Sequence, residues 1–271
     1  IAYVVQPEGT QPEIWLMNED GSGQKLLLRN AEKPAWSPDG KKLAYVRPVG
    51  VERGTSTSEI RVADYDGTSD IRIKKLERGM VGGIAPLGLG WSHDDRQLCY
   101  NDRPRQDGIN CADIVTARET IITLVPPPVV SRDEQGSSHR FVTSFDISPA
   151  DGSIVYEQRE TGNYVMDKES PIRDHTNNCA RVKDSIWIVD ASGRNRRQLF
   201  SQLRFEECGV IMSFEAAGGP AFHPAWSPDG KRIAFYSWET AETKTESGQV
   251  RRQANLVGLA SLDADGGNLR R

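Results

Sequence analysis

Residues 34–46 read PAWSPDGKKLAYV, and residues 224–237 read PAWSPDGKRIAFYS. Two weaker copies of the same pattern lie between them, LGWSHDDRQLCYN at 89–101 and SFDISPADGSIVYEQ at 144–158. Such similarity within one chain indicates an internal repeat, and repeats at this spacing indicate several copies of one supersecondary unit. The repeat therefore decides the architecture.

The centre of the pattern, Ser-Pro-Asp-Gly, has the composition of a turn. Proline fixes φ, aspartate bonds to the backbone two residues further on, and glycine accepts a positive φ. The flanking residues alternate or are β-branched, as in half-buried strands. A second half follows, as in IWLMNEDGSGQKLL at 14–27 and SIWIVDASGRNRRQL at 185–199, with a hairpin turn between two further strands. Each repeat therefore predicts four antiparallel strands.

These repeats predict an all-β protein, a β-propeller of four-stranded antiparallel blades, because radial repetition protects the edges of such sheets. Five blades are visible, and the first lacks its first strand, since IAYVV at 1–5 matches the second strand of the pattern. We expect a single domain, residues 1–271. Either a further blade lies outside this segment, which would make it part of a propeller of six or more blades, or polypeptide beyond it supplies the missing strand. The expected blades are 1–28, 33–76, 88–125, 143–200 and 223–271.

An aromatic residue marks the first strand of each complete repeat. These residues are Trp36, Trp91, Phe145 and Trp226. A tryptophan side chain buries on the order of 200 Å². We therefore expect these rings to pack between neighbouring repeats.

The pattern PxWSPDGxxIAF…IWxMDxDGxxxxxL resembles the TolB-like (PD40, WD40-like) β-propeller repeat, and the resemblance covers essentially the whole chain. It is carried most clearly by residues 34–46, 185–199 and 224–237. Members of that family form six-bladed propellers, with seven or eight blades in peptidase relatives, so five visible blades depart from the family pattern. The resemblance implies a periplasmic or extracellular protein, because TolB-type proteins are mostly periplasmic.

Composition excludes several classes of function. The formal net charge is −4 over 271 residues and the basic residues are scattered, so no nucleic-acid footprint is expected. The longest apolar runs, such as residues 1–5, are too short to span a bilayer. The chain opens inside a strand-like run without Met, and we expect a processed or trimmed N-terminus.

Four cysteines are compatible with two disulfides, and their spacing does not resemble a metal knuckle. Cys179 and Cys208 lie in two connections that flank the same blade, and we predict that they pair. Cys99 and Cys111 fall at facing positions of adjacent strands. They either form a disulfide across the hairpin or remain two buried thiols.

The connections between strands differ in length according to the end of the blade on which they lie. Alternating strand direction places the Ser-Pro-Asp-Gly turns on one face and the longer connections on the other. The expected long connections are 6–13, 47–58, 77–88, 102–110, 125–143, 159–184, 200–222 and 238–254. Insertions that do not serve the scaffold tend to mark the binding face.

We therefore expect a protein or peptide partner at the long-loop face. The candidate binding residues are His139, Arg140, Arg173, Asp174, His175, His223, Trp238 and Glu239. No Gly-x-Ser-x-Gly elbow, P-loop or dinucleotide-binding fingerprint is present, so we expect neither catalytic residues nor a metal-ligand set in this segment. The expected cofactor is none, apart from a calcium or other divalent ion that the channel could hold.

Three hypotheses of function follow. The first is an extracytoplasmic scaffold that binds protein partners without catalysis. The alternative is the propeller domain or subunit of a larger periplasmic enzyme or complex, such as a peptidase, polysaccharide lyase or multihaem oxidoreductase, with its catalytic groups outside this segment. The third is a metal-dependent lyase that uses His139, His175 and His223, which the spacing of these residues does not support by itself.

Overall fold

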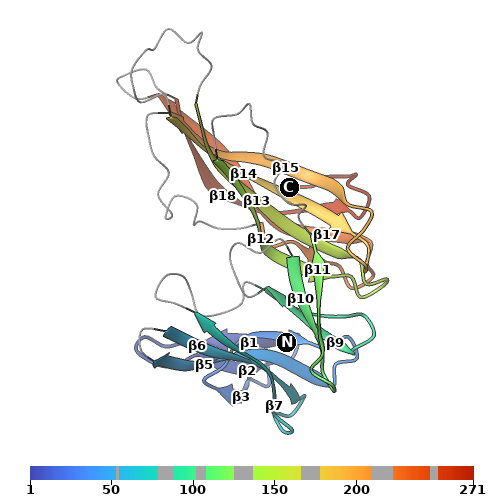
Figure 1. Cartoon of the computed structure of the whole chain (residues 1–271). Coiled ribbons are helices and arrows are strands. Elements are labelled where there is room, and N and C mark those ends of the chain that lie inside the picture. Colours follow the sequence, from blue (N-terminus) through green and yellow to red (C-terminus); the bar gives the residue numbers. More distant parts are fainter. Residues whose placement is uncertain are drawn as a thin grey trace. The chain divides into compact units, whose positions relative to one another are not determined.

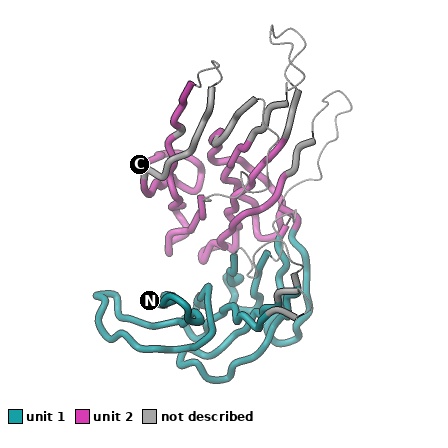
Figure 2. The backbone as a smooth tube through the Cα atoms, turned by 90° about the vertical axis from the view of Figure 1, so that its left-hand side faces the viewer, with its two compact units in different colours: residues 1–103, 109–122 teal, residues 104–108, 123–271 magenta. Residues whose placement is uncertain are grey.

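A computed structural model describes residues 1–52, 55–78, 88–101, 108–124, 137–165, 178–208, 222–244 and 250–271. Within these ranges the secondary structure is β-strand and turn, without a helix. The chain divides into two compact units, which Figure 2 shows in different colours. Unit 1 contains Ile1–Arg103 and Ile109–Ile122, and unit 2 contains Pro104–Gly108 and Thr123–Arg271. Each unit is described by itself.

Unit 1 contains three antiparallel sheets, which are named blades 1 to 3 (Figure 1). Blade 1 has three strands: β1 (Ala2–Val5), β2 (Glu13–Leu16) and β3 (Lys25–Arg29). Blade 2 has four: β4 (Glu32–Trp36), β5 (Lys42–Glu52), β6 (Thr55–Asp64) and β7 (Ile71–Arg78). Blade 3 has four: β8 (Gly88–Trp91), β9 (Gln97–Asn101), β10 (Gly108–Asp113) and β11 (Glu119–Thr123).

Unit 2 contains blades 4 and 5. Blade 4 has four long strands: β12 (Ser137–Ile147), β13 (Ile154–Val165), β14 (Asn178–Val189) and β15 (Arg197–Cys208). Blade 5 has β16 (Ala225–Trp226), β17 (Arg232–Lys244) and β18 (Val250–Asp263). An isolated bridge between Ser261 and Arg270 occupies the position of its fourth strand. The prediction of an all-β protein with five antiparallel propeller blades, the first lacking one strand, is confirmed.

The Ser-Pro-Asp-Gly segments form the predicted turns. In blade 2 the Ser37 hydroxyl donates to Asp39 Oδ1 at 2.7 Å, and its oxygen accepts the backbone N–H of Lys42 at 2.9 Å. The same contacts recur in blade 5 around Ser227, whose hydroxyl donates to Asp229 Oδ1 at 2.6 Å. The serine and aspartate side chains thus supply hydrogen bonds to backbone N–H groups of the turn, which have no partner in the strand pairing.

The aromatic residues of the first strands pack against the preceding blade within each unit. The Trp91 indole N–H of blade 3 donates to the backbone oxygen of Ala35 in blade 2 at 3.0 Å. Trp36 packs against a buried cluster that includes Ile14 of blade 1, and Trp226 against one that includes Ile186 of blade 4. The prediction that these rings pack between neighbouring blades is therefore confirmed for those pairs of blades that lie within one unit.

Parts of several connections predicted as long loops, 47–58, 159–184, 200–222 and 238–254, are strand where the structure describes them, which corrects their boundaries. The pairing of β5 with β6 continues to Glu52 opposite Thr55. The pairing of β13 with β14 continues to Val165 opposite Asn178, and that of β17 with β18 to Lys244 opposite Val250. The physical reason is that each residue pair added to an antiparallel ladder has its backbone hydrogen-bonding groups paired, so the two strands continue until the chain turns.

Candidate functional site

The candidate site is the end of unit 2 at which β13–β14 and β17–β18 form their hairpins, named here the hairpin end. Figure 1 shows the long strands of blade 4 running side by side toward it. The opposite ends of these strands carry the short turns 148–153 and 190–196. In an antiparallel sheet such turns and hairpins necessarily lie at opposite ends. The hairpin end is therefore where blades 4 and 5 can vary without disturbing the repeat.

A buried group of charges lies at the root of the hairpin end. The Arg159 guanidinium on β13 donates from Nε to Asp184 Oδ1 at 2.7 Å and from Nη2 to Asp184 Oδ2 at 3.3 Å. These two residues face each other in the register of β13 and β14. Glu157 Oε1 lies 3.7 Å from Arg159 Nη2, an ion-pair distance that is too long for a hydrogen bond. All three residues are almost fully buried.

Glu157 also connects blade 4 to blade 5. Its Oε2 accepts the backbone N–H of Phe222 at 2.9 Å and the hydroxyl of Ser144 at 3.2 Å. One guanidinium faces two carboxylates here, so the group would carry a net negative charge in the interior with both carboxylates ionised. Burial, followed by repulsion from Asp184, raises the pKa of Glu157 to about 7.

A second buried carboxylate makes a parallel connection. Asp146 Oδ2 accepts the backbone N–H of Trp226 at 2.7 Å, four residues beyond the amide that Glu157 binds. Burial raises the pKa of Asp146, and hydrogen bonds from the backbone of Trp226 and Ile147 oppose the rise. Two carboxylates of blade 4 thus hold the segment that leads into blade 5.

The predicted binding residues at this end divide into several groups. The Arg140 guanidinium pairs with Glu160 at 3.1 Å, directly opposite in the register of β12 and β13, and both side chains are partly exposed. The backbone of His139 lies opposite Thr161. Glu239 is exposed on β17. Arg173, Asp174, His175 and the side chain of His139 lie outside the described residues.

Two predicted residues of blade 5 have different environments. His223 is exposed, has a positive φ, and meets the ring of Tyr236 edge-on at 6.1 Å between centroids. Trp238 is only 6% exposed and packs in the core cluster of Phe222 and Phe235, which removes its ring from any exposed binding surface. Its backbone oxygen accepts the side-chain amide of Gln202 at 2.8 Å, which connects β17 with β15.

The charged group of Glu157, Arg159 and Asp184 is absent from the sequence-based candidates. Glu157 lies in the predicted strand copy 144–158, but Arg159 begins the connection 159–184 that was predicted as loop, so the shared face of the two residues was not recognised. Their partner Asp184 follows 25 residues after Arg159, and only the register of β13 with β14 brings it opposite. Among side chains that the structure places, no cluster of three metal-binding residues occurs.

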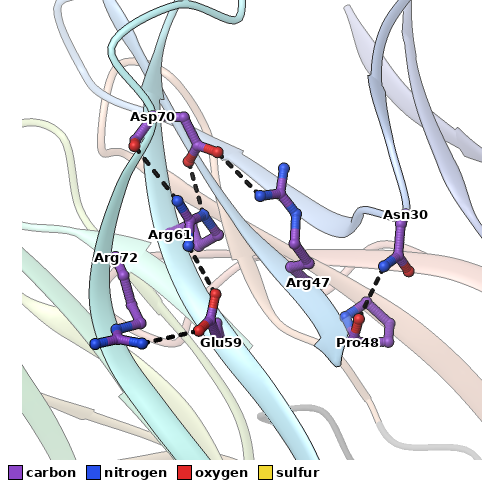
Figure 3. Close-up of polar contacts among 7 residues, drawn as sticks. All are labelled: Asn30, Arg47, Pro48, Glu59, Arg61, Asp70 and Arg72. Atoms are coloured by element: carbon purple, nitrogen blue, oxygen red, sulfur yellow. Dashed lines mark hydrogen bonds and ion pairs between the residues drawn. The ribbon is translucent and has the colours of Figure 1, made fainter. Parts of the chain in front are cut away.

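Unit 1 has a charged network of a different kind on blade 2 (Figure 3). Asp70, which precedes β7, accepts hydrogen bonds from Arg47 at 3.0 Å and from Arg61 at 2.8 Å. Glu59 accepts one from Arg61 at 2.7 Å and one from Arg72 at 3.1 Å. Burial would raise the pKa of Asp70, but the hydrogen bond from Arg61 and the positive charges of Arg61 and Arg47 outweigh it and the pKa is lowered.

Each guanidinium of this network already has a carboxylate partner. Figure 3 also shows Asn30, whose side-chain amide donates to the backbone oxygen of Pro48 at 2.9 Å and so connects the turn after β3 to β5. These contacts join strands of blades 1 and 2 within unit 1. We interpret them as structural contacts rather than as a ligand site, since a free anion would have to displace an existing partner.

The structure joins Cys99 and Cys111 in a disulfide across β9 and β10, which decides between the two alternatives that the sequence left open. Both residues are buried. The backbones of Cys179 and Cys208 lie directly opposite each other on β14 and β15. Their side chains lie outside the described residues, so their pairing stays a prediction.

The sheets and their repeated turns define the class of protein: an all-β protein built from β-propeller blades. The repeats are similar in sequence to part of TolB proteins, which supports a TolB-like propeller repeat. The Tol-Pal system protein TolB of Bordetella avium is 38% identical over 78 residues, which are 26% of this chain and 18% of that protein. No family model matches the chain.

Two further similarities cover most of the chain. Dipeptidyl-peptidase 5 of Porphyromonas endodontalis is 24% identical over 254 residues, which are 87% of this chain and 34% of the peptidase. The β-propeller domain of the trilobed protease from Pyrococcus furiosus aligns with 99% of this chain and 80% of that chain, with 17% identity and a TM-score of 0.44. The chain spans about a third of the length of the peptidase and less than a fifth of TolB.

Proposed function

We propose that this chain is a protein-binding propeller module of an extracytoplasmic protein, and that the partner contacts the hairpin end. The observation that carries this proposal is a buried group of charged residues at the base of this end, with accessible charged side chains beyond it. The buried Glu157, Arg159 and Asp184 fix the base of the β13–β14 hairpin, while charged side chains such as Arg140 and Glu239 remain accessible above it.

The extracytoplasmic setting is supported by two observations. The buried Cys99–Cys111 disulfide is of a kind that persists in oxidising compartments and is rare in the cytosol. TolB, which shares the repeat, belongs to the Tol-Pal system by its name. The described residues contain no helix that could cross a lipid bilayer.

The test replaces residues 166–177 by a short glycine-serine turn. A wider deletion such as 159–184 would remove Arg159 and Asp184 and so unfold blade 4, which would make loss of binding uninformative. The readout is cross-linking of the natural protein in its own cell envelope, with partners identified by mass spectrometry. A partner lost in the hairpin variant and kept in a Lys41→Glu control at the short-turn end supports the proposal. Retention of every partner by the hairpin variant contradicts it.

A second candidate function is the propeller domain of a larger peptidase. It is favoured by the match to dipeptidyl-peptidase 5, which extends over nearly the whole of this chain but only a third of that enzyme. The test is the intact mass of the natural polypeptide together with its release of dipeptides from chromogenic substrates. A polypeptide near 30.1 kDa without such activity would exclude this candidate.

A further inference from the structure

The last strand of blade 3, β11 (Glu119–Thr123), is an edge of its sheet. The strand order of this blade is β11-β10-β9-β8, and within the described ranges no strand pairs with the outer side of β11. It is an internal strand, and the turn after β10 leads directly into it. The backbone groups on its outer side are therefore available to another polypeptide.

The hydrogen-bonding direction of each β11 residue follows from the turn before the strand. The N–H of Asp113 on β10 donates to the backbone oxygen of Arg118 at 3.0 Å, so Arg118 turns this oxygen toward β10. Because the direction alternates along an antiparallel strand, the even-numbered residues of β11 bond to β10. The odd-numbered residues Glu119, Ile121 and Thr123 therefore direct their N–H and C=O groups outward.

The side chains of β11 do not protect this edge. Ile121, in the middle of the strand, is 73% exposed. Glu119 is the only charged residue of the strand, and its carboxylate already pairs with Lys74 Nζ at 2.8 Å and accepts the Tyr100 hydroxyl at 2.7 Å. Proteins usually protect an open edge with lysine, proline or a bulge. The outer strands β3, β7 and β15 each contain lysine or arginine, whereas β11 contains neither of them and no proline.

A second copy of β11 is complementary to this edge. A two-fold axis at Ile121, the middle residue, pairs all five residues of the strand with the second copy. Ile121 then lies opposite Ile121, Thr120 opposite Ile122, and the outward backbone groups of both copies meet. Glu119 lies opposite Thr123, and the two Glu119 side chains are four residues apart, about 14 Å along the strands. No like charges face each other, so charge does not oppose this pairing.

We propose that two copies of this chain associate edge to edge through β11, antiparallel about a two-fold axis at Ile121. The two copies of blade 3 then form one continuous sheet, and the interface is isologous. Five paired residues on each side make a small interface, so we expect a weak dimer with a Kd on the order of 0.1 mM. Blade 3 carries this edge and blades 4 and 5 carry the hairpin end, so the proposal does not depend on the proposed function.

The first test is sedimentation velocity of the natural polypeptide from micromolar to millimolar concentration. We expect a reversible monomer–dimer equilibrium. Hydrogen exchange followed by NMR gives the residue-level readout. The amides of Ile121 and Thr123 should exchange more slowly as the concentration rises, because pairing with a second copy engages their outward N–H groups. The amide of Thr120, which already bonds to β10, should not change.

The second test places a charge at the two-fold axis. Ile121→Lys sets two like charges directly opposite each other, and we expect dimerisation at least about tenfold weaker with an unchanged far-ultraviolet circular dichroism spectrum. The matched control is Val115→Lys, because Val115 is also apolar, is 88% exposed and lies in the turn before β11. It should dimerise as the wild type does.

A charge-swap experiment tests the register itself. Ile121→Glu should also prevent dimerisation, whereas an equimolar mixture of Ile121→Lys and Ile121→Glu should associate again, since opposite charges then face each other. Four results would each overturn the proposal: a wild-type monomer at millimolar concentration, undiminished dimerisation of Ile121→Lys, equal loss in Val115→Lys, or a mixture that associates no better than its two components.

Discussion

The carboxylate of Glu157 on β13 accepts the backbone N–H of Phe222 at 2.9 Å, across 65 positions of the chain. The acceptor is completely buried, so the hydrogen bond joins blade 4 to the segment that enters blade 5 through a charge held away from water. A neighbouring carboxylate, Asp146, makes the equivalent contact to Trp226. The junction of the two blades therefore responds to the protonation of these acids.

The first prediction concerns pH. The pKa of Glu157 is raised from 4.5 to about 7, because burial and Asp184 disfavour its charge. The folded state then binds a proton that the unfolded state has lost, so this residue's stabilising contribution is complete below about pH 4.5 and is lost as pH rises through 7. We expect Glu157→Gln to flatten the fall in unfolding free energy between these values, measured by urea denaturation.

The control for this prediction is Glu160→Gln, which alters a partly exposed ion pair with Arg140 on the same strand. It should leave the pH dependence in this range unchanged. An unaltered slope in Glu157→Gln would show that the buried charge is not the titrating group.

The second prediction compares two glycines at the same position of the repeated turn. Gly40 and Gly230 have φ of +69° and +66°, so alanine is strained at both by roughly 1 kcal/mol. A Cβ built on Gly230 would lie 2.6 Å from the Cβ of Ala150. A Cβ built on Gly40 would have no neighbouring atom within 4 Å among the described residues. We expect Gly230→Ala to lower stability by about 1–3 kcal/mol more than Gly40→Ala. Equal losses in thermal denaturation would contradict this contact.

The third prediction concerns the hydrogen bond between blades 2 and 3. Trp91→Phe keeps an aromatic ring but removes the N–H that Ala35 accepts, and we expect a loss of about 0.5–1.5 kcal/mol because a part-buried hydrogen bond between the blades is lost. The matched control is Trp15→Phe, whose indole bonds locally to Glu13 and is partly exposed. It should cost clearly less in the same denaturation experiment.

The fourth prediction concerns the cysteines. Peptide mapping without reduction should recover Cys99 linked to Cys111, and also Cys179 linked to Cys208, whose backbones face each other in the same manner. Replacing Cys99 and Cys111 together by alanine should destabilise the chain by about 2–3 kcal/mol, as expected for a short loop. Recovery of alkylated Cys179 and Cys208 from the non-reduced protein would disprove the second pairing.

The candidate site was predictable only in part. The sequence pattern located the hairpin end of blade 4 correctly in the chain, but it took β-strands such as 159–165 for loop, because distance from the turn motif says nothing of how far a ladder extends. It also proposed Trp238 as a binding residue. Whether that ring is exposed depends on Phe222 and Phe235 packing around it, and strand alternation alone does not decide this.

The sequence by itself determined the repeat, the number of visible blades, the Ser-Pro-Asp-Gly turns and the packing role of the tryptophans, because each depends on local turn chemistry or on strict periodicity. Tertiary structure alone decided the burial of Glu157 with Arg159 and Asp184 and the link to Phe222. These depend on which strands become neighbours and in which register, and such pairings join residues far apart in the chain. The twin PAWSPDGK segments thus specify the turns of the scaffold, while the pairing of distant strands decides which side chains lie together.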